Sequence, residues 1–130
     1  MKVLLACDGE QRLYIEALAR AIRTFRSYVE VAVIDMGELE TEVDRFHPQL
    51  VIVSGASIPP NPVDLQLLGH IELSPKSEPL SRFRVGERFW EATNPTTLGE
   101  IFTVVDEVQV LYSTFREQEK PMDTDDEEEA

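Results

Sequence analysis

Polar side chains that could bind a ligand or take part in a reaction follow several short apolar runs of this sequence. The run KVLLAC ends in Cys7 and continues into Asp8, VEVAVID ends in Asp35, LVIVS ends in Ser54 and HIELS ends in Ser74. In an open parallel sheet, the carboxyl ends of the strands form the edge where ligands bind and reactions occur. Carboxylates at that edge can hold a divalent cation, whereas a serine or cysteine becomes a nucleophile only when a neighbouring group activates it.

Each of these residues also has a purely structural interpretation. Ser54 is either a phosphorylatable serine or a strand-end hydroxyl bonded to backbone. Cys7 is a buried apolar residue unless a basic neighbour lowers its pKa, and none is evident. Asp8 is either a metal ligand or an acceptor at a helix N-terminus. Asp35 would suit a ribose hydroxyl, but the turn CDGEQR lacks the three glycines of a dinucleotide fingerprint.

The elements that would position these residues alternate along the first half of the chain. Apolar runs predict strands over 2–7, 29–35 and 50–54. A stripe of Leu13, Ala17, Leu18, Ala21, Ile22 and Phe25 predicts a helix, and a shorter one over 39–46 stops before Pro48. The order β-α-β-α-β predicts a parallel sheet with helices on both faces.

The second half is less regular, with prolines and weak periodicity from 55 to 87. HIELS predicts a fourth strand, and RFWEA, residues 88–92, a fifth. Leu98 to about Phe115 predicts a final helix, which Thr97 and Glu100 begin as a capping box. The expected fold is a three-layer α/β/α sandwich whose five-stranded, mostly parallel sheet has the order 2-1-3-4-5, with the third or fourth helix shortened or irregular.

Composition limits the function classes. The chain has 130 residues, one cysteine and a formal net charge of −13. The excess of acid argues against nucleic-acid phosphate as a ligand, and no apolar run is long enough to cross a bilayer or act as a signal peptide. We therefore expect a cytoplasmic protein. Residues 1–116 form the expected domain, and 117–130 an acidic, disordered tail.

Several segments together resemble the receiver domain of bacterial two-component response regulators. KVLLACD resembles the family's first strand, which ends in two acidic Mg²⁺ ligands, and PQLVIVS its third, which ends in the phosphoacceptor aspartate. Ser74 falls near the family's switch Ser/Thr, and Asn94-Pro95 resembles its Lys-Pro pair. The resemblance spans about residues 1 to 115 and implies the receiver-like fold described above.

The departures from the family pattern indicate a disabled phosphorylation site. The acidic pair becomes Cys7-Asp8, the phosphoacceptor becomes Ser54 and the lysine becomes Asn94. Phosphoryl transfer to an aspartate needs the carboxylate, the divalent cation and a positive group. Asp8 alone would be at most a weak remnant ligand, so the resemblance implies no metal and no cofactor.

The expected function is therefore that of a stand-alone pseudo-receiver, a non-enzymatic protein-interaction module. By resemblance, the interaction surface lies around residues 88–112, with Trp90 and Tyr112 as exposed anchors, and self-association through the last strand and helix is one option. Packing of Trp90 with Phe89, Phe102 and Phe115 is the other interpretation of these aromatic residues. The alternative function is that of a flavodoxin-like domain binding a nucleotide or another small ligand in the pocket at the strand ends.

Overall fold

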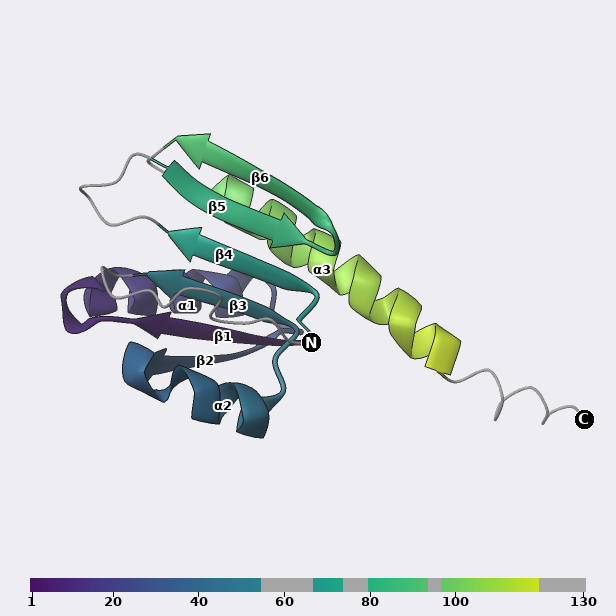
Figure 1. Cartoon of the computed structure of the whole chain (residues 1–130), viewed down its shortest axis with the longest axis horizontal. Helices are drawn as coiled ribbons and strands as arrows, with labels where there is room; N and C mark the ends of the chain where they lie inside the picture. The colour runs from purple at the N-terminus through teal and green to yellow at the C-terminus, as the bar shows by residue number, and fades with distance from the viewer. Residues whose placement is uncertain (55–66, 74–79, 94–96, 120–130) are drawn as a thin grey trace, which may run out of the picture.

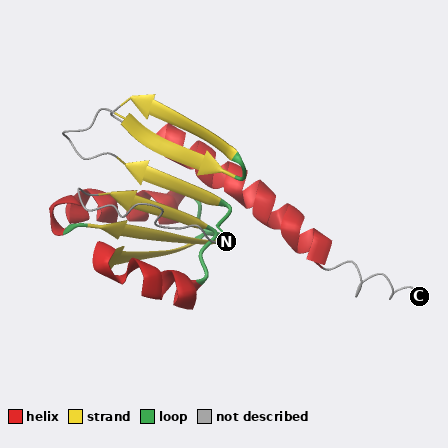
Figure 2. Cartoon of the chain, in the orientation of Figure 1, coloured by secondary structure: helices red, strands yellow, loops and turns green. Residues whose placement is uncertain are grey.

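The computed structural model describes residues 1–54, 67–73, 80–93 and 97–119 (Figure 1). The strands are β1 (Lys2–Cys7), β2 (Glu30–Asp35), β3 (Leu50–Ser54), β4 (Gly69–Leu73), β5 (Leu80–Val85) and β6 (Arg88–Thr93). The helices are α1 (Arg12–Phe25), α2 (Leu39–Phe46) and α3 (Leu98–Glu119), with short 3-10 turns η1 (Gly9–Gln11) and η2 (Met36–Glu38) before the first two. Figure 2 shows the strands as one layer.

The sheet confirms the α/β class and corrects the details of the prediction. It has six strands in the order β2-β1-β3-β4-β5-β6. The pairs β1–β2, β1–β3 and β3–β4 are parallel, whereas β5 is antiparallel to both β4 and β6. The predicted five-strand order is wrong because the sequence between HIELS and RFWEA forms a strand of its own. The predicted fifth strand is β6.

A tight turn explains why a hairpin forms here instead of a crossover. Val85 pairs with Arg88 across two residues, Gly86 and Glu87. Gly86 has a φ of 61°, and Glu87 is not among the residues with positive φ. Glycine at the first of two central positions is typical of a type II′ turn, whose twist matches that of antiparallel strands. The local turn therefore reverses the chain and lets β6 run parallel to β4.

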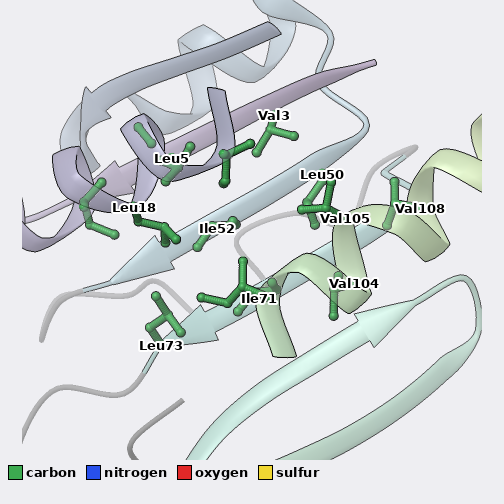
Figure 3. Close-up of a cluster of buried hydrophobic side chains, with 14 of the residues drawn as sticks. Val3, Leu5, Leu18, Leu50, Ile52, Ile71, Leu73, Val104, Val105 and Val108 are labelled. Atoms are coloured by element: carbon green, nitrogen blue, oxygen red, sulfur yellow. The ribbon is translucent and has the colours of Figure 1, made fainter. Parts of the chain in front are cut away.

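The larger core lies between the sheet and the layer formed by α1 and α3. Figure 3 shows side chains of the central strands directed toward the two helices, among them Leu5, Ile52 and Ile71. Leu18 contributes from α1 and Val105 from α3, and all are buried. Since these contacts join segments from the whole described chain, the core makes one unit of the sheet and both helices.

A smaller core covers the opposite face. Leu4, Ala6, Val51 and Val53 pack there against Leu39 of α2. Each of β1 and β3 therefore has apolar side chains on both faces, as their continuous apolar runs predicted. Helices on both faces of the sheet are confirmed.

The helix α1 lies where the sequence predicted it, but with a different buried face. The buried residues are Ile15, Leu18, Ala19 and Ile22. Leu13 and Phe25, which the prediction placed on the apolar stripe, are 82% and 62% exposed. Ile15 belongs to the stripe because it precedes Leu18 by three positions and Ile22 by seven, which are the spacings of one helical face.

The capping box of α3 is confirmed, whereas its end was misplaced. The backbone N–H of Thr97 donates to Glu100 Oε1 over 2.9 Å, and the N–H of Glu100 donates to Thr97 Oγ1 over 3.1 Å. The helix continues to Glu119, so residues 117–119, assigned to the tail, are helical. In Figure 1 its last turns extend beyond the edge of the sheet at which β1 begins. Residues 120–130 of the predicted tail lie outside the described residues.

No helix in the described part of the chain is long and apolar enough to span a membrane.

Candidate functional site

The strand register brings together three of the residues singled out in the sequence. Cys7 pairs with Asp35 of β2 on one side and with Ser54 of β3 on the other. Asp8 follows directly, and its backbone N–H donates to the carbonyl of Ser54 over 3.3 Å. The carboxyl ends of β1, β2 and β3 thus form the expected edge.

Cys7 and Ser54 are buried at this edge. Their side chains share the sheet face of Leu5 and Ile52, because residues two apart on a strand point to the same side. Cys7 has no exposed surface and Ser54 is 1% exposed. Burial raises the pKa of the Cys7 thiol, an effect that the nearby Arg12 opposes only in part. The thiol is therefore protonated at neutral pH, and neither side chain is placed to attack a substrate from solvent.

Asp35 is held in an ion pair. Arg12, at the start of α1, donates from Nη1 to Asp35 Oδ1 over 2.7 Å and from Nε to Glu16 Oε2 over 3.0 Å. The Arg12 side chain is 40% exposed and that of Asp35 is 67% exposed. A ligand that used the Asp35 carboxylate would have to displace Arg12. The geometry ties α1 to β2 and offers a cation rather than a free carboxylate.

The other predicted positions at this edge are only partly described. Asp8 precedes η1, where its backbone carbonyl accepts the N–H of Gln11 over 3.0 Å. Ser74 and Asn94 lie outside the described residues. Within the described ranges, no three His, Cys, Asp or Glu side chains are close enough together to hold a metal ion.

Trp90, a predicted exposed anchor, is half-buried in a stack. Its ring lies nearly parallel to that of Phe83, with centroids 5.3 Å apart and an interplanar angle of 6°. The guanidinium of Arg88 lies 4.5 Å from the Trp90 ring centroid and also pairs with Glu107 of α3. Trp90 therefore joins the hairpin to the core.

Tyr112, the second predicted anchor, is also half-buried. Its hydroxyl accepts a hydrogen bond from Arg116 Nη1 over 3.1 Å, one turn further along α3. Beside it on the helix, Val110 is 64% exposed and Phe115 is 47% exposed. Val110, two positions from Tyr112, faces another side of the helix, so the exposed apolar surface here belongs to Val110 and Phe115 rather than to the predicted anchor.

An open groove of about 630 Å³ lies between α3 and the β5–β6 turn. Four of its lining residues are apolar, which we call the floor: Val85, Gly86, Val110 and Leu111. Three are charged, which we call the rim: Glu87, Arg88 and Glu107. The groove falls within the range 88–112 that the resemblance indicated, apart from the turn residues 85–87. We call it the hairpin groove.

The hairpin groove was missed because β5 was missed. Along residues 81–85 of this strand, Ser81, Phe83 and Val85 are buried, whereas the two arginines between them are more exposed. That alternation is the ordinary signature of a strand with one covered face, and Gly86 marks the turn. Both signals stand in the sequence and, together with α3, would have located the groove.

Comparisons of the chain with protein-family models, with curated proteins and with solved structures found no match.

Proposed function

We propose that this chain is a non-enzymatic protein-interaction domain that binds a partner through the hairpin groove. The observation that carries the proposal is an apolar floor left open between α3 and the β5–β6 turn. Val110 is 64% exposed there, beside half-buried Leu111. Apolar grooves with a charged rim are typical places for the side chain of a partner to insert.

The charges define the kind of partner. Arg88 on the rim is already paired with Glu107, whereas Glu87 has no ion pair with any residue that the structure describes. The chain as a whole has a net charge of −13. Complementary charge speeds encounter and orients the bound partner. The occupant we propose is a protein segment with a large apolar side chain flanked by lysine or arginine.

The strand-end edge supports a role without phosphorylation. Ser54 stands where the receiver resemblance expects the phosphoacceptor, and it is buried beside Cys7. The order β2-β1-β3-β4 supports a receiver-like origin, whereas the antiparallel β5 takes the place of a crossover in that resemblance. The finer proposal is therefore a pseudo-receiver whose last third has been rebuilt around a hairpin.

Peptide display on the full chain tests the groove. Selected peptides are expected to carry an apolar residue within a few positions of lysine or arginine, and one of them is then synthesised for titration. Val110→Glu should weaken its binding by about tenfold or more, because the substitution places charge on the apolar floor. Leu13→Glu is the matched control, since Leu13 is 82% exposed on the distant helix α1. Equal affinity for both variants would refute the groove as the binding site.

A separate measurement tests the pseudo-receiver proposal. Beryllofluoride with Mg²⁺ mimics the aspartyl phosphate of an active receiver. We expect no Mg²⁺-dependent change in thermal stability on its addition, because the third strand ends in a buried serine. A clear Mg²⁺-dependent stabilisation would refute the proposal, whatever the peptide experiment shows.

A further inference from the structure

The strand β6 has a regular outer edge that pairs with no other strand in the described part of the chain. It pairs with β5 through six consecutive residue pairs, from Val85–Arg88 to Leu80–Thr93, and it is the last strand of the sheet. In a hairpin with a two-residue turn, the pair that closes the turn exchanges both of its hydrogen bonds. Arg88, Trp90 and Ala92 therefore direct their backbone groups toward β5. Phe89 and Glu91 direct theirs outward, where another strand can bind.

The side chains along this edge leave it accessible. Phe89 is 73% exposed. The two charged residues that would discourage pairing are engaged within the domain, Arg88 with Glu107 and Glu91 with Arg82. No proline or bulge interrupts the register of β6. These are the properties of an edge strand that can accept a further strand.

The opposite edge of the sheet is less available. On β2, the side chain of Arg23 reaches from α1 and donates from Nη2 to the carbonyl of Val31 over 3.3 Å. The N–H of Glu30 is bonded to Met1 of the neighbouring segment, so Val31 belongs to the outward set of this strand. A strand that approached β2 would have to displace Arg23, whereas one that approached β6 displaces no such contact with another described residue.

We propose that β6 pairs antiparallel with β6 of a second copy of this chain, which joins the two sheets into one. A two-fold axis normal to the sheet keeps the same face upward in both copies, so α3 and its symmetry mate lie on the same side. Even-numbered residues of one copy then lie opposite even-numbered residues of the other, and odd-numbered opposite odd-numbered. The axis that fits best passes beside Trp90.

Side-chain chemistry selects this register. With Trp90 opposite its counterpart, five residues of each strand pair, and Phe89 lies diagonal to the Phe89 of the second copy. Aromatic pairs across and diagonally between strands stabilise a sheet. An axis at Glu91 would place the two Glu91 carboxylates opposite each other, and an axis at Phe89 would oppose Glu87 and Glu91. Like charges directly opposite one another destabilise pairing.

The charge of the chain sets the conditions for association. Two copies, each with a net charge of −13, repel each other at low ionic strength. Salt screens that repulsion, while backbone hydrogen bonds and aromatic contacts depend on it much less. The dimer should therefore be weak in dilute buffer and stronger at higher salt, the opposite of an association held by opposite charges. Its existence is independent of whether the hairpin groove binds a partner.

Sedimentation over a range of protein concentrations tests the proposal on the full chain. We expect a monomer–dimer equilibrium that shifts toward dimer between 20 and about 300 mM salt, as the Debye length shortens. Phe89→Lys should raise the dissociation constant by about tenfold or more, since lysine on an edge strand opposes pairing. Leu13→Lys makes the same charge change at an exposed site on α1 and should leave the dimer intact.

A second variant separates edge pairing from a general surface effect. Glu91→Pro removes an outward N–H and blocks an incoming strand, while the hydrogen bonds to β5 remain. Circular dichroism checks that the variant is folded. Loss of the dimer in both β6 variants but not in Leu13→Lys supports the proposal. A monomer at all concentrations and salts, or a dimer that survives both β6 variants, overturns it.

The register has its own test. The chain has a single tryptophan, so the emission of Trp90 should shift to shorter wavelength as the dimer forms. The double variant Phe89→Cys, Glu91→Cys should form a disulfide-linked dimer under mild oxidation, because residues 89 and 91 oppose each other in the proposed register. Faster linkage of the single variant Glu91→Cys would place the axis at Glu91 and overturn the register.

Discussion

Arg26 at the end of α1 and Asp106 in the middle of α3 form a two-point ion pair. Arg26 Nε lies 2.7 Å from Asp106 Oδ1, and Nη2 lies 2.9 Å from Oδ2. The guanidinium also lies 4.9 Å from the ring centroid of Phe102. Because α1 and α3 cover the same face of the sheet, this pair fixes their relative position at the end remote from Cys7.

Breaking that pair should measurably destabilise the domain. Asp106→Asn is expected to lower the free energy of unfolding by about 1 kcal/mol, since bidentate pairs exceed ordinary surface pairs but Asp106 is half-exposed. Asp35→Asn removes the more exposed, single-point pair with Arg12 and should cost less than about 0.5 kcal/mol. Urea titrations at neutral pH measure both variants. A larger loss for Asp35→Asn would contradict this ranking.

At Gly69, β4 lies tightly against α3. A Cβ atom at this position would lie 2.5 Å from Val108 Cγ2 and 3.1 Å from Leu50 Cδ1. Gly69→Ala should therefore push α3 away from the sheet and destabilise the domain by about 1–3 kcal/mol. Gly9→Ala is the matched control, because no atom lies within 4 Å of its added Cβ. Thermal unfolding of the two variants compares them, and equal melting temperatures would refute the tight contact.

His70 predicts how stability depends on pH. Its Nε2 atom is buried and has no hydrogen-bond partner among the described residues, and burial, reinforced by Arg84, lowers its pKa to about 4. The unfolded chain therefore binds a proton that the folded chain does not as pH falls from about 6.5 to 4. Stability should fall across this window, by at most about 3 kcal/mol from this residue.

The contribution of His70 is separable from that of the carboxylates. His70→Phe should remove its share of the acid sensitivity, which urea titrations at pH 7 and pH 4.5 would detect. Asp106 acts in the same direction but at lower pH. Its hydrogen bond with Arg26 lowers the pKa of the carboxyl group, and the stability that this pair contributes is lost as the carboxylate is protonated. An unchanged pH dependence in the variant would contradict the assignment to His70.

Cys7 should resist modification in the folded protein. Its side chain has no exposed surface, and burial raises the pKa of the thiol. A thiol reagent at pH 8 is expected to react at the rate of global unfolding, and to react at once in denaturant. Rapid labelling of the native chain would contradict this expectation. It would show that the edge formed with Ser54 opens and that the Cys7 thiol is able to react in the folded protein.

The first half of the fold was predictable because the sequence of each segment is enough to indicate whether it forms a strand or a helix. Strands buried on both faces need continuous apolar runs, as in LVIVS, and crossovers of the observed length favour helices. The register of Cys7 between Asp35 and Ser54 followed from strand ends alone. The ion pair of Arg12 with Asp35 did not, because it depends on side-chain positions that no sequence period encodes.

The second half failed for a different reason. The arginines of LSRFRV break the apolar run, and the prolines before it suggested a loop, although the alternation of Phe83 with its polar neighbours was that of a strand. Without β5 there was no hairpin, and the position of Trp90 was assigned from resemblance. Packing of Trp90 was one interpretation of the sequence, but its stacking on Phe83 depends on pairing between β5 and β6, so this partner could not be anticipated.

Strand pairs of this sheet also differ in the length of chain that joins them, and the Gly86 turn provides the shortest connection in the described part of the chain. β5 and β6 meet across two residues, whereas β1 and β3 meet through pairs such as Val3–Leu50, 47 positions apart. Closing a short loop costs less entropy and a hairpin forms within microseconds, while non-local pairing is slow. The hairpin can therefore form early, and the rate of folding is set by the crossovers that bring β1 between β2 and β3.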